Sequence, residues 1–282
     1  MKFNIETAEV FVPDGLGVKE ALARTTDMAV GAHQDDLEIM AFSGILGCFQ
    51  RDDRWFCGVT VTDGSGAPRS GVYGKYTDEQ LQVVRRQEQK KAAVVGEYGA
   101  QVLLDYPSST VKGGSEALVQ DIAMLLELAK PEVVYTHNLA DKHDTHVAVA
   151  LRVIEAIRGL PEDERPQRLY GCEVWRDLDW MVDADKVAFD VSGHESLQAA
   201  LLGVFDSQVC GGKRYDLATL GRRRANATYH APFETDAATG MAFAMDLTPL
   251  IQDTGRGVQA FVRECTERFV RDVLDRMERL QE

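Results

Sequence analysis

One short stretch of the sequence places an imidazole and two carboxylates within four positions. This stretch is Ala32-His33-Gln34-Asp35-Asp36, and it follows an apolar run that is typical of a buried strand. His33 and Asp36 are three positions apart across a strand-to-helix turn, so both side chains could reach one metal ion. The alternative is that Asp35 or Asp36 simply caps the next helix, as aspartate commonly does.

A second polar stretch holds three of the six histidines of the chain. They are His137, His143 and His146, and they follow another apolar run and open a helical pattern. Because His143 and His146 are three positions apart, they share one face of a helical turn. The alternative here is a polar surface loop in which Asp144 caps the helix.

Both stretches belong to a pattern in which short apolar runs alternate with helical segments. The expected strands are Met28–His33, Trp55–Thr62, Gln101–Tyr106, Glu132–Thr136 and Arg168–Trp175. The main expected helices are Leu37–Gln50, a long helix that starts with a capping box at Thr77–Gln80, Glu116–Lys130, Val147–Arg158, Glu195–Gln208 and Val258–Leu280. This alternation predicts an α/β, Rossmann-like three-layer domain with a mainly parallel sheet and helices on both faces. Residues 210–255 show little periodicity and are expected to form loops around a binding cleft.

The two polar stretches are expected to form one site, because ligands of parallel sheets bind beyond the carboxyl ends of the strands. His33, Asp36 and one further histidine would supply the two-histidine, one-carboxylate set of a catalytic zinc that keeps a position open for water. Asp35 would then be free to act as a general base towards a water that attacks a carbonyl carbon. A spare imidazole could stabilise the oxyanion that forms.

The segment Ala32 to Glu38 resembles the Ala-His-Pro-Asp-Asp-x-Glu signature of the PIG-L/LmbE-type zinc-dependent de-N-acetylases, and His143-x-x-His146 resembles the His-x-Asp-His motif of that family. Further similarities follow in family order: Thr62-x-Gly64, Arg85-x-x-Glu88, Glu173-Val-Trp175 and Ser207-Gln208. The resemblance covers about residues 26–210. It implies a single domain over residues 1–282, in which residues 211–282 form an irregular segment and a C-terminal helix.

The resemblance also implies roles for five residues: His33, Asp36 and His146 would hold the metal, Asp35 would be the general base, and His143 would polarise the carbonyl or protonate the leaving amine. The expected cofactor is Zn²⁺, with Fe²⁺ as the alternative. The expected reaction removes an acetyl or similar acyl group from an N-acyl amino sugar, such as an N-acetylglucosamine derivative, or from a related small amide.

Several alternatives stay open from the sequence. The chain could be a catalytically silent sugar-binding or regulatory module on the same fold, and a metallophosphoesterase ranks below both. His137, at the end of a strand, is the alternative to His146 as the third ligand.

The chain departs from the family signature at two positions in these motifs. Gln34 replaces the proline, so we expect a looser turn. Thr145 replaces the aspartate before the second histidine and so removes a carboxylate near the metal; such partners change affinity or activity about 10-fold or more. Asp144 or Asp141 could take its place, and the sequence leaves this choice open.

Arginines outside the two polar stretches are expected to lie on the protein surface rather than in the site. We expect Arg85 and Arg86 to form ion pairs on a helix surface with Glu88 and its neighbours. We expect Arg222 to Arg224 to lie on a solvated face, with contact to an anionic group of the substrate as the alternative.

Composition limits the classes of partner. The chain has 282 residues, with 31 basic and 45 acidic side chains and a formal net charge of -14. This balance argues against nucleic acid or an anionic membrane as the main partner, because both need a cationic surface. The longest mostly apolar run, Ile39 to Phe49, is too short to span a bilayer, and the N-terminus lacks a secretory signal. Five scattered cysteines without a C-x-x-C pair predict buried thiols in a reducing cytosol. We therefore expect a cytoplasmic protein with a small-molecule substrate, with a homo-oligomer left open.

Overall fold

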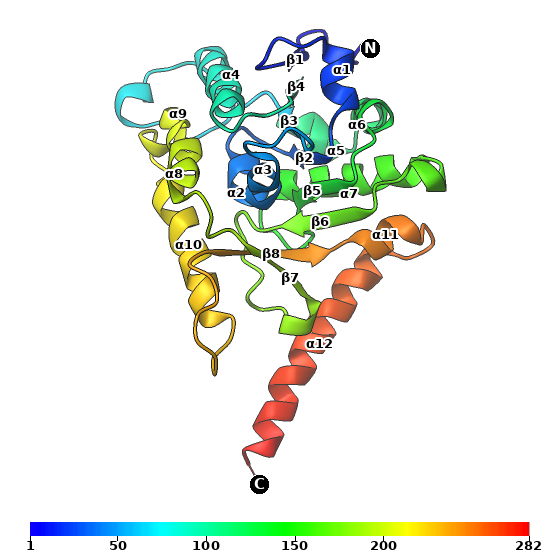
Figure 1. Cartoon of the computed structure of the whole chain (residues 1–282), viewed down its shortest axis with the longest axis vertical. Coiled ribbons are helices and arrows are strands. Elements are labelled where there is room, and N and C mark those ends of the chain that lie inside the picture. The colour runs from blue at the N-terminus through cyan, green and yellow to red at the C-terminus, as the bar shows by residue number, and fades with distance from the viewer. Residues whose placement is uncertain (282) are drawn as a thin grey trace.

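The protein is built around one β-sheet, as the computed structural model shows for residues 1–281 (Figure 1). Among these residues the sheet has eight strands in the order β1-β4-β3-β2-β5-β6-β8-β7. The strands are β1 (Glu9–Phe11), β2 (Asp27–Gly31), β3 (Phe56–Thr62), β4 (Ala100–Tyr106), β5 (Val133–His137), β6 (Arg168–Cys172), β7 (Lys186–Asp190) and β8 (Met241–Asp246).

The five central strands, from β4 through β3, β2 and β5 to β6, run parallel. β1 adds to one edge antiparallel to β4, and β8 and β7 complete the other edge in antiparallel pairs. From β2 the chain proceeds through β3 and β4 towards one edge, and it later proceeds from β5 to β6 towards the other. The strand order therefore reverses between β2 and β5, where the loops diverge and a ligand can bind.

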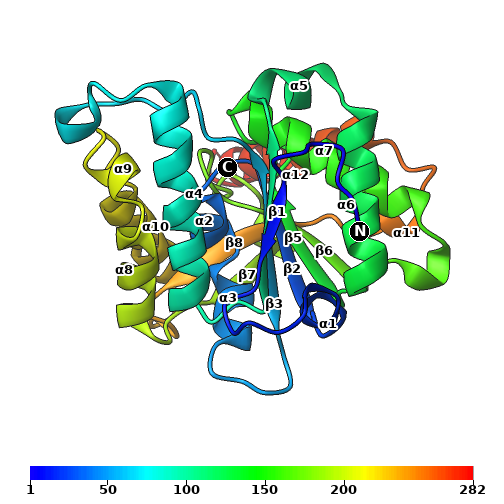
Figure 2. The same cartoon turned by 90° about the horizontal axis from the view of Figure 1, so that it is seen from above.

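Helices cover both faces of the sheet, as the view in Figure 2 shows. One layer contains α2 (Asp36–Met40), α3 (Phe42–Cys48), α4 (Asp78–Val95), α8 (Glu195–Gly203), α9 (Asp206–Val209) and α10 (Tyr215–Tyr229). The other contains α1 (Val18–Ala23), α5 (Ser108–Gly113), α6 (Glu116–Ala129), α7 (Asp144–Gly159) and α11 (Thr248–Gln252). Short 3₁₀ helices span Gly71–Tyr73, Glu162–Glu164 and Asp183–Asp185. The predicted three-layer α/β fold is confirmed.

The C-terminal helix α12 (Val258–Arg279) begins against the body of the protein and then extends away from it (Figure 1). Its buried side chains, Phe261 and Cys265, both lie in the first half of the helix and join the apolar core. No helix within residues 1–281 is long and apolar enough to cross a membrane.

The central strands are buried because helices pack on both of their faces. Every residue of β2 and β3 is buried. Along β2, Met28 and Val30 belong to one apolar cluster and Ala29 to the other, as expected when alternate side chains of a strand point to opposite faces. This packing holds the carboxyl ends of β2 and β5 rigidly side by side.

The predicted elements agree with the observed ones except in three places. The expected helix Leu37–Gln50 is two helices, α2 and α3, which meet at Ala41. The expected helix Glu195–Gln208 is likewise divided into α8 and α9. The prediction that residues 210–255 are loops is wrong, because α10, β8 and α11 lie there. The capping box at Thr77 and Gln80 is confirmed at the start of α4.

The expectation of buried cysteines holds for four of the five. Cys48, Cys57, Cys172 and Cys265 are buried, whereas Cys210 is exposed at the end of α9.

Candidate metal centre and active site

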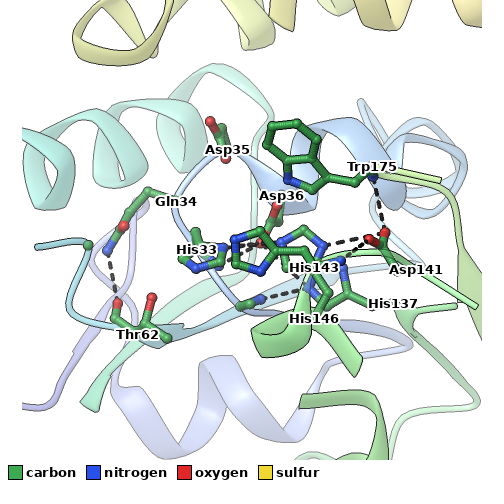
Figure 3. A network of polar contacts seen from close by, with 12 residues as sticks. His33, Gln34, Asp35, Asp36, Thr62, His137, Asp141, His143, His146 and Trp175 are labelled. Atoms are coloured by element: carbon green, nitrogen blue, oxygen red, sulfur yellow. Dashed lines mark hydrogen bonds and ion pairs between the residues drawn. The ribbon is translucent and has the colours of Figure 1, made fainter. Parts of the chain in front are cut away.

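The two polar loops meet at the carboxyl ends of β2 and β5. These strands pair in parallel, with Ala29 opposite Tyr135, so the chain leaves both strands at the same edge of the sheet. The His33 and His146 rings lie 5.2 Å apart, measured between their centroids, although 113 positions separate the residues along the chain. Figure 3 shows the imidazoles of His33, His143 and His146 gathered around the carboxylate of Asp36.

Three side-chain atoms from this group form a nearly equilateral triangle. His33 Nδ1 lies 3.2 Å from Asp36 Oδ2 and 3.2 Å from His146 Nε2, and the third side, from His146 Nε2 to Asp36 Oδ2, measures 3.4 Å. Zinc–nitrogen and zinc–oxygen bonds of about 2.0–2.2 Å in tetrahedral geometry place neighbouring ligand atoms about 3.3–3.5 Å apart. The triangle therefore has the dimensions of three corners of a tetrahedral zinc site.

The charges in this triangle also suit a cation. Burial alone would raise the pKa of Asp36, but the surrounding imidazoles of His146, His137 and His33 lower it below its usual range. Burial lowers the pKa of His33, so its imidazole is neutral and has a free lone pair. A carboxylate and neutral imidazoles are the protonation states that bind a metal.

His137 is close to this triangle, but its Nε2 already takes part in a hydrogen bond. Its Nε2 accepts a hydrogen bond from the backbone N–H of Ala32 at 2.8 Å, and its ring stacks on His146 at 3.9 Å between centroids. Nε2 also lies 3.5 Å from Asp36 Oδ2, which makes Asp36, His137 and His146 a second possible ligand set. The Nε2 lone pair of His137 already accepts the hydrogen bond from Ala32 N–H. His33 is therefore the better candidate to bind a metal ion together with Asp36 and His146.

Asp141 stabilises the loop that carries His143 by hydrogen bonds to the backbone. Its side chain is fully buried; Oδ1 accepts the backbone N–H of His143 at 2.9 Å, and Oδ2 accepts that of Trp175 at 3.0 Å. Oδ2 also lies 3.5 Å from His146 Nδ1. Asp144, by contrast, is exposed. Of the two carboxylates that could replace the aspartate missing at Thr145, the structure places Asp141 behind His146.

Asp35 occupies a strained position beside the triangle. It is the N-cap residue of α2 in the left-handed conformation, with φ 89°, and its side chain makes no capping hydrogen bond. Its Oδ2 is buried and has no hydrogen-bond partner within residues 1–281. Burial raises the pKa of Asp35 well above its usual range, although the Arg85 guanidinium opposes this. A non-glycine residue with positive φ commonly marks a functional site.

His143 lies on the open side of the triangle. Its ring stacks on His146 at 4.5 Å and on Trp175 at 6.1 Å between centroids (Figure 3). Burial, followed by the charges of His146 and His33, lowers the pKa of His143 to about 4. It occupies the N-cap position of α7, in place of Asp144, and its side chain makes no capping hydrogen bond. Neither polar stretch is explained by helix capping.

The turn after β2 is held more tightly than expected. The Gln34 side chain is buried and donates from Nε2 to the carbonyl of Thr62 at 3.1 Å (Figure 3). Gly64 lies against Gln34 with φ 77°, a conformation that suits glycine. The expectation of a looser turn is wrong, because Gln34 links this turn to the end of β3.

The other family-like motifs also meet in space. Glu88 accepts hydrogen bonds from the backbone N–H of Ser207 at 2.7 Å and from its Oγ at 2.6 Å, across 119 positions of sequence. Arg85 is buried and donates to the carbonyls of Gln34 and Gly64 at 2.8 and 3.2 Å. The expectation of surface ion pairs for Arg85 is wrong, since it braces the turn that carries Asp35.

A groove of about 520 Å³ opens above these residues. His33, Asp35, Asp36 and His143 line its floor, and its walls include residues that the sequence did not single out: Ser108, Lys112, Lys213 and Tyr215. Lys213 also lies 5.0 Å from the centre of the Trp175 ring. These wall residues carry no spacing signal, because they come from α5, α10 and the segment before α10.

The arginine cluster of α10 is divided between the interior and solvent. Arg223 is buried and donates to Gln198 Oε1 at 2.9 Å and to the carbonyl of Glu38 at 2.9 Å, while Arg224 is exposed. Arg222 donates to the carbonyl of Val174. The expectation of a solvated face holds for Arg224 and is wrong for Arg223, which fastens α10 to α2 and α8.

Three solved structures illustrate the similarity of the fold. The 4-carboxy-2-hydroxymuconate hydratase from Pseudomonas putida KT2440 is 16% identical, with a TM-score of 0.59 over 79% of this chain and 96% of that one. The N,N'-diacetylchitobiose deacetylase from Pyrococcus horikoshii is 14% identical, with a TM-score of 0.59 over 78% and 83%. The A40926 pseudoaglycone deacetylase Dbv21 is 17% identical, with a TM-score of 0.58 over 79% and 97%.

Comparison with curated proteins gave no significant match. Residues 28–157 match the model of the PIG-L family, which is described as GlcNAc-PI de-N-acetylase. The matched segment begins in β2 and ends in α7, so it contains both polar loops and every residue of the triangle. Residues 28–157 are therefore a PIG-L family domain.

Proposed function

We propose that the chain is a metal-dependent hydrolase that removes an acetyl or similar acyl group from an N-acyl amino sugar or a related small amide. The triangle of His33 Nδ1, Asp36 Oδ2 and His146 Nε2 carries this proposal, because it has the dimensions and charge of a cation site. The PIG-L family match supports the class of reaction.

His33, Asp36 and His146 would hold the cation, which we infer to be Zn²⁺ or Fe²⁺. Such an ion supplies Lewis-acid chemistry, since it polarises a carbonyl and makes water a stronger acid near neutral pH. His137 has the different task of accepting the Ala32 N–H, which holds the strand end that leads to His33.

In the proposed reaction, Asp35 takes a proton from the attacking water. Asp35 lines the groove, has a left-handed backbone conformation and makes no capping hydrogen bond to the helix that follows it. The water oxygen bonds to the acyl carbon, and the proton it loses passes to Asp35. A buried carboxylate with a raised pKa is a strong base for this step.

In the same proposal, His143 hydrogen-bonds the carbonyl oxygen as negative charge develops on it. With a pKa of about 4, its imidazole is neutral near neutral pH and acts through its N–H. The proton that the leaving amine needs then comes from Asp35, as the bond between carbon and nitrogen breaks. The products are a carboxylic acid and an amine, the proton of the acid passes to the amine to give a carboxylate and an ammonium ion, and Asp35 returns to its starting state.

The fold by itself does not select the reaction, since one structural neighbour is a hydratase. The silent-module alternative would leave no role for the unpaired, buried carboxylate of Asp35 beside the triangle. We therefore favour the enzyme.

The test is acetate release from N-acetylglucosamine and its conjugates by the zinc-loaded and iron-loaded protein. Asp35→Asn should lower kcat about 100-fold or more while the metal content stays unchanged. Asp52→Asn, at an exposed aspartate outside the groove, is the matched control and should match the wild type. Full turnover by Asp35→Asn would refute the base assignment. One bound metal with no turnover on a broad amide panel would favour the silent module.

We infer a cytoplasmic location from the cysteine pattern, in which four thiols are buried and unpaired. The proposed partner is a small-molecule substrate rather than nucleic acid, in keeping with a net charge of -14. Whether the chain forms a homo-oligomer is a question for light scattering.

A further inference from the structure

A second, apolar cleft adjoins the catalytic groove. It has a volume of about 140 Å³ and lies between α2, the segment after β6, α10 and β8. The two hollows share four lining residues, Ile39, Val174, Trp175 and Tyr215. Trp175 connects the cleft to the chemistry, because its ring stacks on His143 on one side and meets Tyr215 edge-on at 6.1 Å on the other.

Several polar groups in the wall of this cleft are already bonded within the protein, although Arg223 Nε has no hydrogen-bond partner within residues 1–281. Glu173 accepts hydrogen bonds from the backbone N–H groups of Leu178 and Phe243 and from Asn226 Nδ2, at 2.7, 3.1 and 3.0 Å. Arg222 donates to the carbonyl of Val174. A ligand in the cleft therefore meets mainly hydrocarbon and aromatic surface, contributed among others by Met40, Ala218, Ala242 and Phe243.

The groove and the cleft thus differ in chemistry on the two sides of His143. The groove continues towards Ser108, Lys112 and Gln208, which can bond to hydroxyl groups, whereas the cleft wall is mainly hydrocarbon and aromatic, with Thr219, Arg222 and Arg223 as its polar donors. A substrate whose scissile amide lies at His143 has a polar amine half and an acyl half. The amine half suits the polar groove, and the acyl half suits the apolar cleft.

We propose that the apolar cleft binds the acyl chain of the substrate, so that the preferred N-acyl group is longer than acetyl. This inference rests on the proposed function. A cavity of about 150 Å³ can accommodate benzene, which corresponds to a chain of about four to six carbons here. Each methylene buried in the cleft should raise kcat/KM about fourfold, up to that length.

The experiment compares N-acetyl-, N-butanoyl- and N-hexanoylglucosamine with the metal-loaded protein. Steady-state kinetics give kcat/KM for each amide, and calorimetry gives Kd for the same amides independently of turnover. Ala218→Leu places a larger side chain at the exposed edge of the cleft, where it should not disturb the core. Ala225→Leu, an exposed alanine on the same helix outside the cleft, is the matched control.

In the wild type and in Ala225→Leu, the butanoyl and hexanoyl amides should exceed the acetyl amide about 10-fold or more in kcat/KM, with a parallel decrease in Kd. Ala218→Leu should remove this advantage while acetyl release changes little. Preference for acetyl in the wild type, or an unchanged preference in Ala218→Leu, would overturn the inference. If no amide is cleaved, the proposed function fails, and the dependence of Kd on chain length still decides the role of the cleft.

Discussion

At the scale of single residues, the proposed metal centre depends on groups that position His33, Asp36 and His146 as much as on these three residues themselves. Asp141 contacts three parts of the site at once: the backbone of His143, the backbone of Trp175 and, at 3.5 Å, His146 Nδ1. A carboxylate behind a metal-binding histidine fixes the ring and increases its basicity. Asp141 therefore takes over a role that Thr145 cannot fill.

The first prediction concerns Asp141. Asp141→Asn keeps the size of the side chain but removes its charge, so the affinity for zinc should fall about 10- to 100-fold. Competition with a chromophoric chelator measures the Kd. Asp144→Asn, at an exposed aspartate three positions further on, at the start of α7, is the control and should bind zinc like the wild type. Equal zinc affinities for the two variants would show that Asp141 does not act on His146.

At the scale of the elements, the turn after β2 depends on its contact with the end of β3. Gly64 has positive φ, and a Cβ there would collide with Gln34 Oε1. Gly64→Ala should therefore lower the free energy of unfolding by about 1–2 kcal/mol from backbone strain alone, and displace Gln34. Gly66→Ala, where a Cβ meets no atom within 4 Å, is the control. Urea denaturation measures both; equal stability of the two variants would contradict this account of the turn.

Glu173 joins the segment after β6 to β8 and α10. Burial raises the pKa of Glu173, although three hydrogen-bond donors oppose the shift. The folded state therefore binds this proton more tightly than the unfolded state, so stability falls as pH rises from about 4.5 through the folded pKa.

Glu173→Gln removes this titration. The free energy of unfolding of Glu173→Gln minus that of the wild type should therefore increase as the pH rises from about 5 to about 8. Glu127→Gln, at an exposed glutamate of α6, should show no such change. A difference between Glu173→Gln and wild type that is independent of pH would contradict the raised pKa.

Sequence patterns predicted the elements that carry the metal loops, because β2 and β5 are apolar and their loops are rich in histidine and aspartate. They failed for α10, whose buried face includes Thr219, Arg223 and Asn226 at helical spacing. Polar residues on a buried face leave no apolar period to detect. β8 was missed because its sequence, Met-Ala-Phe-Ala-Met-Asp, has no β-branched residue, so that its strand structure depends on pairing with β6 and β7. The choice of Asp141 over Asp144 also needed the structure, because both are near His146 in sequence and only one points at it.

At the scale of the whole molecule, the close packing of the sheet and helices leaves one accessible thiol. Burial raises the pKa of Cys48 and Cys57 to about 12, which makes these thiols unreactive, and Cys172 and Cys265 are also buried. The native protein should therefore react with one equivalent of Ellman's reagent, and five after denaturation. Cys210→Ser should remove the native reaction. Rapid modification of two or more thiols in the native protein would mean that the core is more open than described.

The whole molecule also explains why residues more than a hundred positions apart can share one cation. The strand order reverses between β2 and β5, and buried packing on both faces fixes these strands, so the loops that follow them cannot move apart without disturbing the sheet. The proposed metal centre is therefore a consequence of sheet topology as well as of the residues in the loops.

The most direct measurement is a crystal structure of the zinc-soaked protein, with anomalous diffraction data collected at the zinc edge. The account predicts one peak bonded to His33 Nδ1, Asp36 Oδ2 and His146 Nε2 at about 2.0–2.2 Å, next to Asp35. A peak coordinated by His137 in place of His33, or no peak within reach of His33 and His146, would contradict it.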